Sequence, residues 1–330
     1  MDKFVEGEDS PRSPVAAAPA YAVQFFLIPL AVVAVTVAVY LGFRSLVTEE
    51  RSAHEYLAII ETGSMSDRWP AAYELSRLMA DPDVAADPTL GPALVRAFRA
   101  STDDGRAGWC GGLGECPPVR RYLALAMGRL TPPLQPEVIP ALVEALDDAD
   151  GETVINAIWA LGSLGDPSVV PHLAAMYRSE DSGVRKVTVY VLGALPGDEQ
   201  ERVLATALND SAVDVRWNAA VALARHQNVE GMPVLLQMLD RTYVEEAVTL
   251  ARTLNRSDEA AANRGVFLEA EDDPVGEVMI SALQALAGLP MASRQDGALR
   301  DAVGMLSRTE PNLRVREAAM VTLKALTRES

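Results

Sequence analysis

Two cysteines lie in the segment GRAGWCGGLGECPP, residues 105 to 118, and they are the only thiols in the chain. Cys110 and Cys116 have five residues between them and glycines on both sides, so a small disulfide ring is sterically possible. Two cysteines are too few for a disulfide framework. Two alternatives stay open: a flexible loop with two free thiols, or a disulfide if this segment faces an oxidising compartment.

The sequence contains no recognisable motif for a metal, phosphate-binding or catalytic site. A zinc ion would need two more ligands beside the cysteines, and no histidine lies near them in sequence. The glycines lack the preceding strand and the Gly-Lys-Ser/Thr that a phosphate-binding loop requires. No Ser-His-Asp set or carboxylate pair is recognisable, and most acidic residues lie at turns and helix starts, where capping explains them. We therefore expect no cofactor, no metal, no small-molecule substrate and no enzymatic activity.

The composition favours helices and excludes one class of partner. Hydrophobic residues make up 49% of the chain but aromatic residues only 5%, so the core must be built from Ala, Leu and Val. Such a core favours close-packed helices over a sheet. The formal net charge is −17. Sequence-independent nucleic-acid binding depends on Lys and Arg that neutralise phosphates, so we expect no nucleic-acid partner.

One segment is typical of a membrane span. Residues 21–43 read YAVQFFLIPLAVVAVTVAVYLGF without a charge, and as a helix they would cover roughly 35 Å. Aromatic residues lie near both ends, as in an interfacial belt. A cleaved signal peptide is the alternative, but its small-residue site should follow the apolar run, whereas AAAPA precedes it. We predict a transmembrane helix over 21–43 and a disordered tail over 1–20.

The charges beside the span indicate an orientation. Arg44 directly follows it, and acidic residues count little in the positive-inside rule. The sequence therefore favours a single-pass protein of a bacterial plasma (inner) membrane whose larger part, after the span, is cytoplasmic.

The rest of the chain is an internal repeat. The segment VRWNAAVALARH at Val215 has counterparts at Val119, Thr153, Val184, Val278 and Val315. The intervals are roughly 31 to 37 residues, the one before Val278 being double. A second helical stretch precedes each copy, and turn residues such as Asp150-Gly151 separate the two. We predict an all-α solenoid of about eight helical pairs over residues 48–330.

The repeat resembles a known family. Its D-x-x-x-V-R-x-x-A-x-x-A-L pattern is similar to HEAT repeats, particularly the HEAT-like type first described in phycobilisome lyases. The resemblance implies that the second helix of each pair lines a concave surface and that an arginine ladder braces the turns. The arginines are Arg120, Arg185, Arg216 and Arg316, and the turn acids they would meet include Asp181 and Asp210. Val154 and Met279 stand where two further arginines would be expected.

The repeat positions divide into two faces. When the recurring valine is counted as position 0, positions 0, 4, 5 and 8 share one helix face and are predicted to be buried. Positions 2 and 6 lie on another stripe, and the candidate partner-binding residues on it are Arg121, Trp159, Lys186, Tyr190 and Trp217. Trp, Tyr and Arg are enriched at binding hot spots. The alternative is that these side chains fill space against the next repeat.

Three functions are compatible with these features. The first is a non-catalytic, membrane-anchored HEAT-repeat scaffold that binds a partner protein next to the bilayer through its concave face. The second is a lyase- or chaperone-like factor for a cofactor-bearing protein, and the third is a permanent accessory subunit of a membrane complex. The related HEAT-like deoxyhypusine hydroxylases use several His-Glu pairs for two irons. The single pair His54-Glu55 cannot supply such a site.

Overall fold

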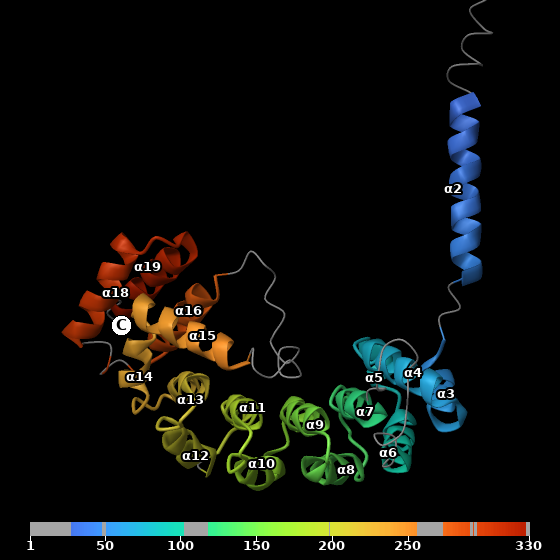
Figure 1. Ribbon diagram of the computed structural model, residues 1–330, viewed down its shortest axis with the longest axis horizontal. Helices are drawn as coiled ribbons and strands as arrows, with labels where there is room; N and C mark the ends of the chain where they lie inside the picture. The colour runs from blue at the N-terminus through green and yellow to red at the C-terminus, as the bar shows by residue number, and fades with distance from the viewer. Residues whose placement is uncertain are drawn as a thin grey trace, which may run out of the picture. The chain divides into compact units, whose positions relative to one another are not determined.

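The computed structural model describes most of the chain as helices joined by short turns (Figure 1). The described residues are 28–47, 51–101, 118–197, 199–255, 273–290, 293 and 296–327. The chain divides into two units, Met1–Ser52 and Ala53–Ser330. Cys110 and Cys116 lie outside the described residues, as does the predicted tail over 1–20.

The first unit contains one described helix, α2 (Ile28–Val47). Residues 30–40 of this helix are all exposed, and most of them are apolar. Within the described parts of the chain, no helix combines the length and the apolar character that crossing a membrane requires. The predicted span began at Tyr21, and its residues 21–27 lie outside the described part.

The second unit consists of helical pairs. The first helices of the pairs are α3 (Ala53–Thr62), α6 (Leu90–Ala100), α8 (Val138–Glu144, continued by η4, Ala145–Asp147), α10 (Val170–Met176, preceded by η5, Pro167–Val169), α12 (Glu199–Ala207), α14 (Met232–Gln237) and α18 (Gly297–Thr309). The second helices are α4 (Met65–Leu78), α7 (Val119–Met127), α9 (Gly151–Leu164), α11 (Ser182–Leu192), α13 (Val213–Arg225), α16 (Pro274–Ala287) and α19 (Leu313–Thr327). Two helices stand outside this alternation: α5 (Pro82–Ala85) and α15 (Arg241–Asn255).

The pairs stack in two layers. Each second helix packs on the second helix of the next pair, from α4 through α7, α9, α11 and α13 to α16 and α19. Each first helix packs on its own partner, and α3 with α6, α6 with α8 and α10 with α12 also pack on one another, so the first helices form the other layer (Figure 1). This is the arrangement of an α-solenoid, in which each unit contacts mainly its neighbours.

One helix departs from the predicted alternation. The sequence predicts that α15 is the second helix of its own pair, but α16 packs directly on α13 and α14, and α15 lies against α16. In the described residues, therefore, α14 and α16 form one pair with α15 inserted between them in sequence. The described part of the second unit holds seven pairs rather than about eight.

The predicted buried stripe is confirmed in the central units. Val215, Ala219, Ala220 and Leu223 are all fully buried. The buried residues form two hydrophobic clusters, and α13 contributes to both: its Val215 belongs to the first and its Ala220 to the second. One helix thus joins the two parts of the core.

Neighbouring second helices approach so closely that a glycine is required where they meet. A Cβ atom added to Gly128 would lie 2.5 Å from the Cα of Ala160, and one added to Gly193 would lie 2.5 Å from the Cβ of Ala222. Gly162 meets Val191 in the same way, at 2.5 Å. In each case position 9 of one second helix contacts position 7 of the next. The small residues of the repeat therefore set the spacing between units.

Turn residues begin and end the second helices as their chemistry predicts. Asp150 accepts a hydrogen bond from the Thr153 N–H at the start of α9, and Asp181 accepts one from the Gly183 N–H at the start of α11. Gly165 ends α9 with a φ of 68°, in the left-handed region that glycine adopts without strain.

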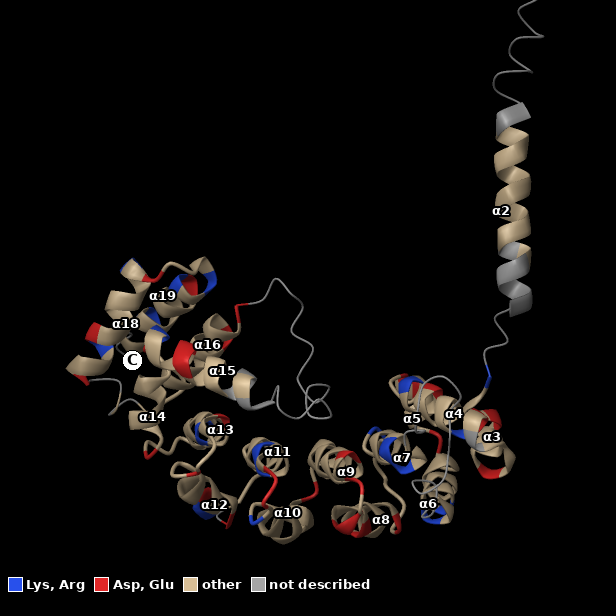
Figure 2. Cartoon of the chain, viewed as in Figure 1, with Lys and Arg blue, Asp and Glu red and all other residues tan. Residues whose placement is uncertain are grey.

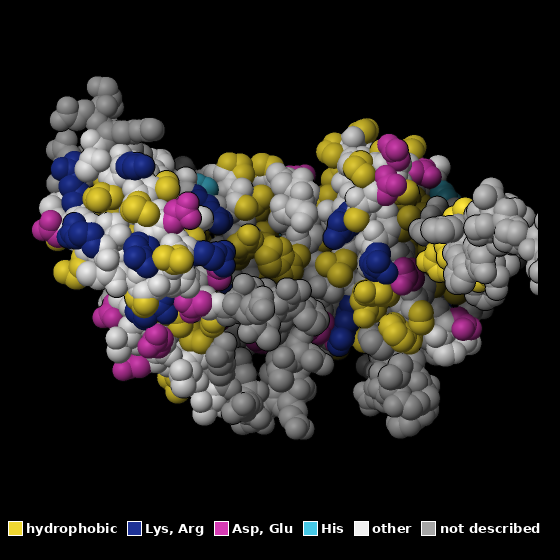
Figure 3. Space-filling view, turned by 90° about the horizontal axis from the view of Figure 1, so that it is seen from above, with side chains coloured by type: hydrophobic (Ala, Val, Ile, Leu, Met, Phe, Trp, Pro, Cys, Tyr) yellow, Lys and Arg dark blue, Asp and Glu magenta, His cyan; other side chains and the backbone are white. Residues whose placement is uncertain are grey.

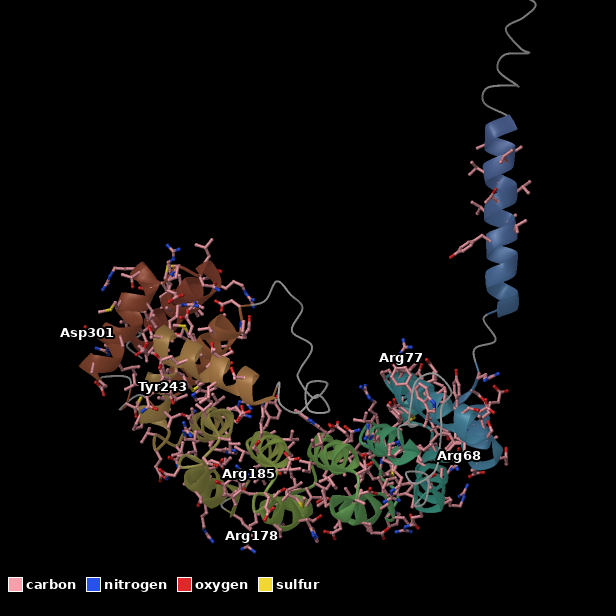
Figure 4. The ribbon with its side chains drawn as sticks, in the orientation of Figure 1. Arg68, Arg77, Arg178, Arg185, Tyr243 and Asp301 are labelled. Carbon is pink, nitrogen blue, oxygen red and sulfur yellow. The ribbon has the colours of Figure 1, made fainter. Side chains whose placement is uncertain are left out.

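A guanidinium clamp joins consecutive turns. The Nε and Nη2 groups of Arg185 each donate to a carboxylate oxygen of Asp210 at 2.9 Å, in the turn of the next pair. Its Nη1 donates at 3.0 Å to the carbonyls of Ser179 and Glu180, in its own turn (Arg185 is labelled in Figure 4). The acid of its own turn, Asp181, instead caps α11. The arginine therefore reaches forward to the following unit.

Two other arginines repeat this clamp. Arg120 donates to Asp148 of the next turn at 2.6 Å and to the Phe98 carbonyl at 2.8 Å. Arg68 donates to the Ile60 carbonyl of its own pair at 2.6 Å and to the Ser101 hydroxyl of the next pair at 3.0 Å. The same geometry therefore holds the first pairs together.

The ladder changes toward the end of the chain. Among the described residues, Arg216 donates only to its own turn, through the carbonyls of Asp210 at 2.7 Å and Ser211 at 3.1 Å. The Nε of Arg316 is buried without a hydrogen-bond partner among the described residues.

The inserted helix supplies the arginine that α16 lacks. Met279 of α16 occupies the position of an arginine and is fully buried. Arg241 of α15 donates to Asp273 at 3.1 Å and to Glu310 at 2.9 Å, so it connects the turns before α16 and α19.

The Arg185–Asp210 clamp is mostly buried, and it lowers the pKa of the Asp210 carboxyl. Partial burial raises the pKa of Asp210, but hydrogen bonds from Arg185 and from the Ala212 N–H outweigh it, so this pKa lies below its usual value. Burial, and after it the Asp210 carboxylate, raises the pKa of Tyr177 to about 12. Since the folded-state pKa of Asp210 is lowered, its stabilising contribution is present above the unfolded value, about 3.9, and is lost as the pH falls through the folded value.

We expect Asp210→Asn to lower the free energy of unfolding at neutral pH by about 2–3 kcal/mol, because Arg185 then lacks its charged partner. Urea unfolding at a series of pH values measures this. The difference from the parent chain should shrink as the pH falls below about 4, the unfolded-state value, and through the lower folded-state pKa of Asp210. Asp301→Asn, at an exposed position of α18, is the matched control and should change little. An equal loss in both variants would contradict the clamp's role.

Candidate functional site

The exposed side of the second helices carries an unusual set of residues. We define the second-helix stripe as positions 2, 6 and 10 of the repeat in the second helices from α4 to α13. Its members are Trp69, Tyr73, Arg77, Arg121, Leu125, Arg129, Ile155, Trp159, Ser163, Lys186, Tyr190, Ala194, Trp217, Val221 and Arg225. The stripe has no acidic residue, although the whole chain carries a net charge of −17. Figure 2 shows acidic residues both on connections and on helices such as α3 and α8, and basic residues on α7, α11 and α13.

Two aromatic residues form the centre of the stripe. Trp159 of α9 and Tyr190 of α11 are 38% and 41% exposed, and their ring centroids lie 5.0 Å apart with an interplanar angle of 54°. The guanidinium of Arg225, in α13, lies 5.7 Å from the Tyr190 ring centroid. Three successive second helices thus build one cluster. Figure 3 looks onto these helices, and hydrophobic side chains gather in the middle of that face with basic residues on either side.

A second aromatic cluster lies on α4 and α7. Tyr73 is 42% exposed and contacts Tyr122 edge to face, with the ring centroids 5.6 Å apart. Arg77 lies 5.8 Å from the centre of the Tyr73 ring and points away from the first helices (Figure 4). Tyr73, Arg77 and Arg225 were not among the residues predicted from the sequence. The recurrence of arginine at position 10 could have indicated Arg77 and Arg225, and Tyr73 shares position 6 with Trp159 and Tyr190.

The prediction that Trp217 faces solvent is wrong. Its side chain is 7% exposed and packs in the second hydrophobic cluster, with its ring centroid 6.5 Å from that of Tyr243 on α15. The indole Nε1 is buried without a hydrogen-bond partner in the described residues. Because α15 covers position 2 of α13, this tryptophan belongs to the core.

Two candidate cations bind the neighbouring unit. Arg121 donates to both carboxylate oxygens of Asp150 at 2.5 and 2.6 Å, and Lys186 lies 3.1 Å from Asp214. The hydrogen bonds that Arg121 donates to the Asp150 carboxylate raise the pKa of Arg121 in spite of burial. These two side chains lie on the predicted stripe, yet their charges already have partners within the solenoid.

Two other cations of the stripe lack such partners. Arg129 follows the end of α7 and Arg225 lies at the end of α13, and both are exposed. Neither makes an ion pair with an acidic residue in the described part of the chain. They lie on either side of the units that carry Trp159 and Tyr190.

A small hollow lies between the start of α6 and the segment 130–135. This hollow of about 100 Å³ is lined by residues that include Pro88, Gly91 and Gln135, well below the roughly 300–1,000 Å³ of ligand pockets. Within the described ranges, no three His, Cys, Asp or Glu side chains gather as metal ligands. The ring of His54 lies 2.9 Å from the Thr89 hydroxyl and 4.0 Å from Asp87.

Comparison with known proteins supports the repeat assignment. Residues 112–193 and 175–255 match the family model for HEAT repeats, so the chain contains HEAT repeats and folds as a HEAT-like helical solenoid. No curated protein matches the chain.

Several solved structures align with much of the chain at low TM-scores. Two engineered proteins are 16% and 18% identical, with TM-scores of 0.36 and 0.37. The alignments cover 83% and 84% of this chain and 96% and 69% of theirs. Human deoxyhypusine hydroxylase in complex with glycerol is 16% identical, with a TM-score of 0.29 and coverage of 84% and 97%. Because these TM-scores lie below 0.5, they carry no argument about function.

Because Trp217 is buried and Trp159 is partly exposed, their substitution by alanine should lower the free energy of unfolding by different amounts. We expect Trp217→Ala to lower the free energy of unfolding by about 3–5 kcal/mol, because it leaves a cavity between α13 and α15. Trp159→Ala, at the exposed position 6 of α9, should cost about 1 kcal/mol or less. Urea unfolding of both variants measures the difference. Similar losses for the two would mean that Trp159 is also a packing residue.

Proposed function

We propose that this chain is a non-catalytic HEAT-repeat scaffold that binds a partner protein through its second-helix stripe, next to a membrane that holds its first unit. The observation that carries the proposal is the exposed pair of Trp159 and Tyr190, with Arg225 beside it. Large aromatic rings and arginine are the side chains that contribute most to binding at protein interfaces.

The fold does not need these rings. The spacing of the units is set by contacts such as Gly162 with Val191, and the turns are joined by arginine clamps. Trp159 and Tyr190 lie outside both features and remain more than one third exposed. Their position across two rigidly packed helices supports a preformed surface, which reduces the entropy cost of binding.

Crosslinking in cells tests the partner. We expect a photoreactive amino acid in place of Ser163, exposed on α9, to give protein adducts in intact cells, because this position lies on the stripe. The same amino acid in place of His172, exposed on the first helix α10, is the control and should not give those adducts. Immunoblots of irradiated cells measure them.

A double substitution sharpens the result. Trp159→Ala with Tyr190→Ala should remove the Ser163 adducts while leaving the thermal unfolding curve nearly unchanged. Adducts that survive this variant, or that form equally from His172, would contradict binding through the stripe.

The membrane attachment is proposed from the first unit. In α2, Leu30, Val33, Val37 and Tyr40 are each 48% exposed or more. A contiguous exposed apolar surface of this kind requires a cover, and the uncharged run over 21–43 supports a bilayer as that cover. Arg44 after the run supports a cytoplasmic second unit at a bacterial inner membrane.

Extraction from membranes tests the attachment. We expect the full chain to stay in the membrane pellet at alkaline pH, and Val33→Glu with Val37→Glu to release it, because a charge in the bilayer centre costs about 2–3 kcal/mol or more per residue. Val229→Glu with Val321→Glu, at exposed sites of the second unit, adds the same charge and should stay in the pellet. A parent chain that is already soluble would contradict the attachment.

A further inference from the structure

We propose that the second-helix stripe between α7 and α13 binds an extended acidic segment of the partner protein, with carboxylates near both ends and apolar or proline residues between them. This inference rests on the proposed function and adds the chemical class of the partner. It starts from the two stripe arginines that have no acidic partner in the described residues, Arg129 and Arg225.

These two arginines bracket the aromatic pair. Arg129, Trp159, Tyr190 and Arg225 come from four successive second helices, α7, α9, α11 and α13. The guanidinium of Arg225 also lies 5.7 Å from the centroid of the Tyr190 ring, so this cation and this aromatic ring are neighbours on the surface. The order along the stripe is therefore cation, aromatic, aromatic, cation.

The local charge is opposite to that of the whole molecule. Two acids at helix starts, Asp150 and Asp214, pair with Arg121 and Lys186 of the stripe. The remaining charge of this part of the stripe is therefore positive. It is carried by the guanidinium groups of Arg129 and Arg225, which have no acidic partner in the described residues. Arginine binds carboxylates with two parallel hydrogen bonds, which gives both attraction and orientation.

The net charge of the chain limits what kind of anion can approach. A long polyanion such as a nucleic acid would be repelled by a molecule with a net charge of −17. A short segment with a few carboxylates meets mainly the nearby cations, because repulsion is screened beyond about 8–10 Å in physiological salt. The observations therefore favour an acidic protein segment.

The spacing of the helices sets the length of the segment. Packed helices lie about 8–10 Å apart, so α7 and α13, three steps apart, are separated by roughly 27 Å. An extended chain covers about 3.3 Å per residue, so about eight residues separate the two acidic groups. Proline or aromatic side chains in between can stack on Trp159 and Tyr190, as extended proline-rich segments do on aromatic surfaces.

Fluorescence anisotropy on the full chain in detergent micelles tests this. The first probe is a labelled peptide with a pair of glutamates at each end and about eight proline, leucine and phenylalanine residues between them. The second replaces the glutamates by glutamine, and the third places all the glutamates at one end. We expect the first probe to bind at least about tenfold tighter than the other two, with an affinity that falls as salt is raised.

A matched pair of variants locates the binding. Arg129→Gln with Arg225→Gln should weaken the first probe about tenfold or more. Arg178→Gln with Arg202→Gln removes the same charge from exposed sites on the side of the first helices and should leave the affinity unchanged (Arg178 is labelled in Figure 4). Unchanged thermal unfolding of both variants excludes a folding defect.

Several results would overturn the inference. No binding of the first probe, equal binding of the glutamine probe, or equal loss in the two arginine variants would each exclude an acidic segment on this stripe. Displacement of the probe by a short single-stranded DNA at equal concentration would indicate a general polyanion surface instead. None of these results removes the Ser163 crosslinks, so a failed inference and a failed proposed function remain distinguishable.

Discussion

The close approach of neighbouring second helices is the constraint on which the rest of the structure depends. Gly128, Gly162 and Gly193 bring each second helix against the next at distances that leave no space for a side chain. The Arg185–Asp210 clamp and the contact between Trp159 and Tyr190 both cross this same interface. Any change that widened it would lengthen all these interactions together, because the layers are rigidly packed.

Each position of the repeat has one physical task, and the tasks do not overlap. Positions 0, 4, 5 and 8 are buried, position 1 carries the clamp, and positions 7 and 9 set the spacing between helices. Position 2 pairs with the next unit in α7 and α11 and packs on the core in α13, whereas positions 6 and 10 are left with few structural duties in most units. The surface can therefore differ chemically from unit to unit while the scaffold stays the same.

Periodicity predicts only part of this arrangement. The buried stripe through Val215 and Leu223 and the caps at Asp150 and Asp181 follow from patterns within one unit, so the sequence alone indicates them. The partner of Arg185 does not, because Asp181 and Asp210 occupy equivalent turns and only the packing offset decides between them. Trp217 was misplaced for a related reason: no local pattern reveals that α15 lies over it.

The inserted helix α15 limits how an extended ligand can align along the second helices. In a perfectly periodic array, an extended chain can slip by one unit and meet equivalent contacts, so its alignment is degenerate. Here position 2 of α13 is covered by Tyr243 and its neighbours, whereas the matching positions of α7 and α11 carry half-exposed cations. The translational symmetry of the array ends at α13. A bound segment would therefore have one preferred alignment and direction.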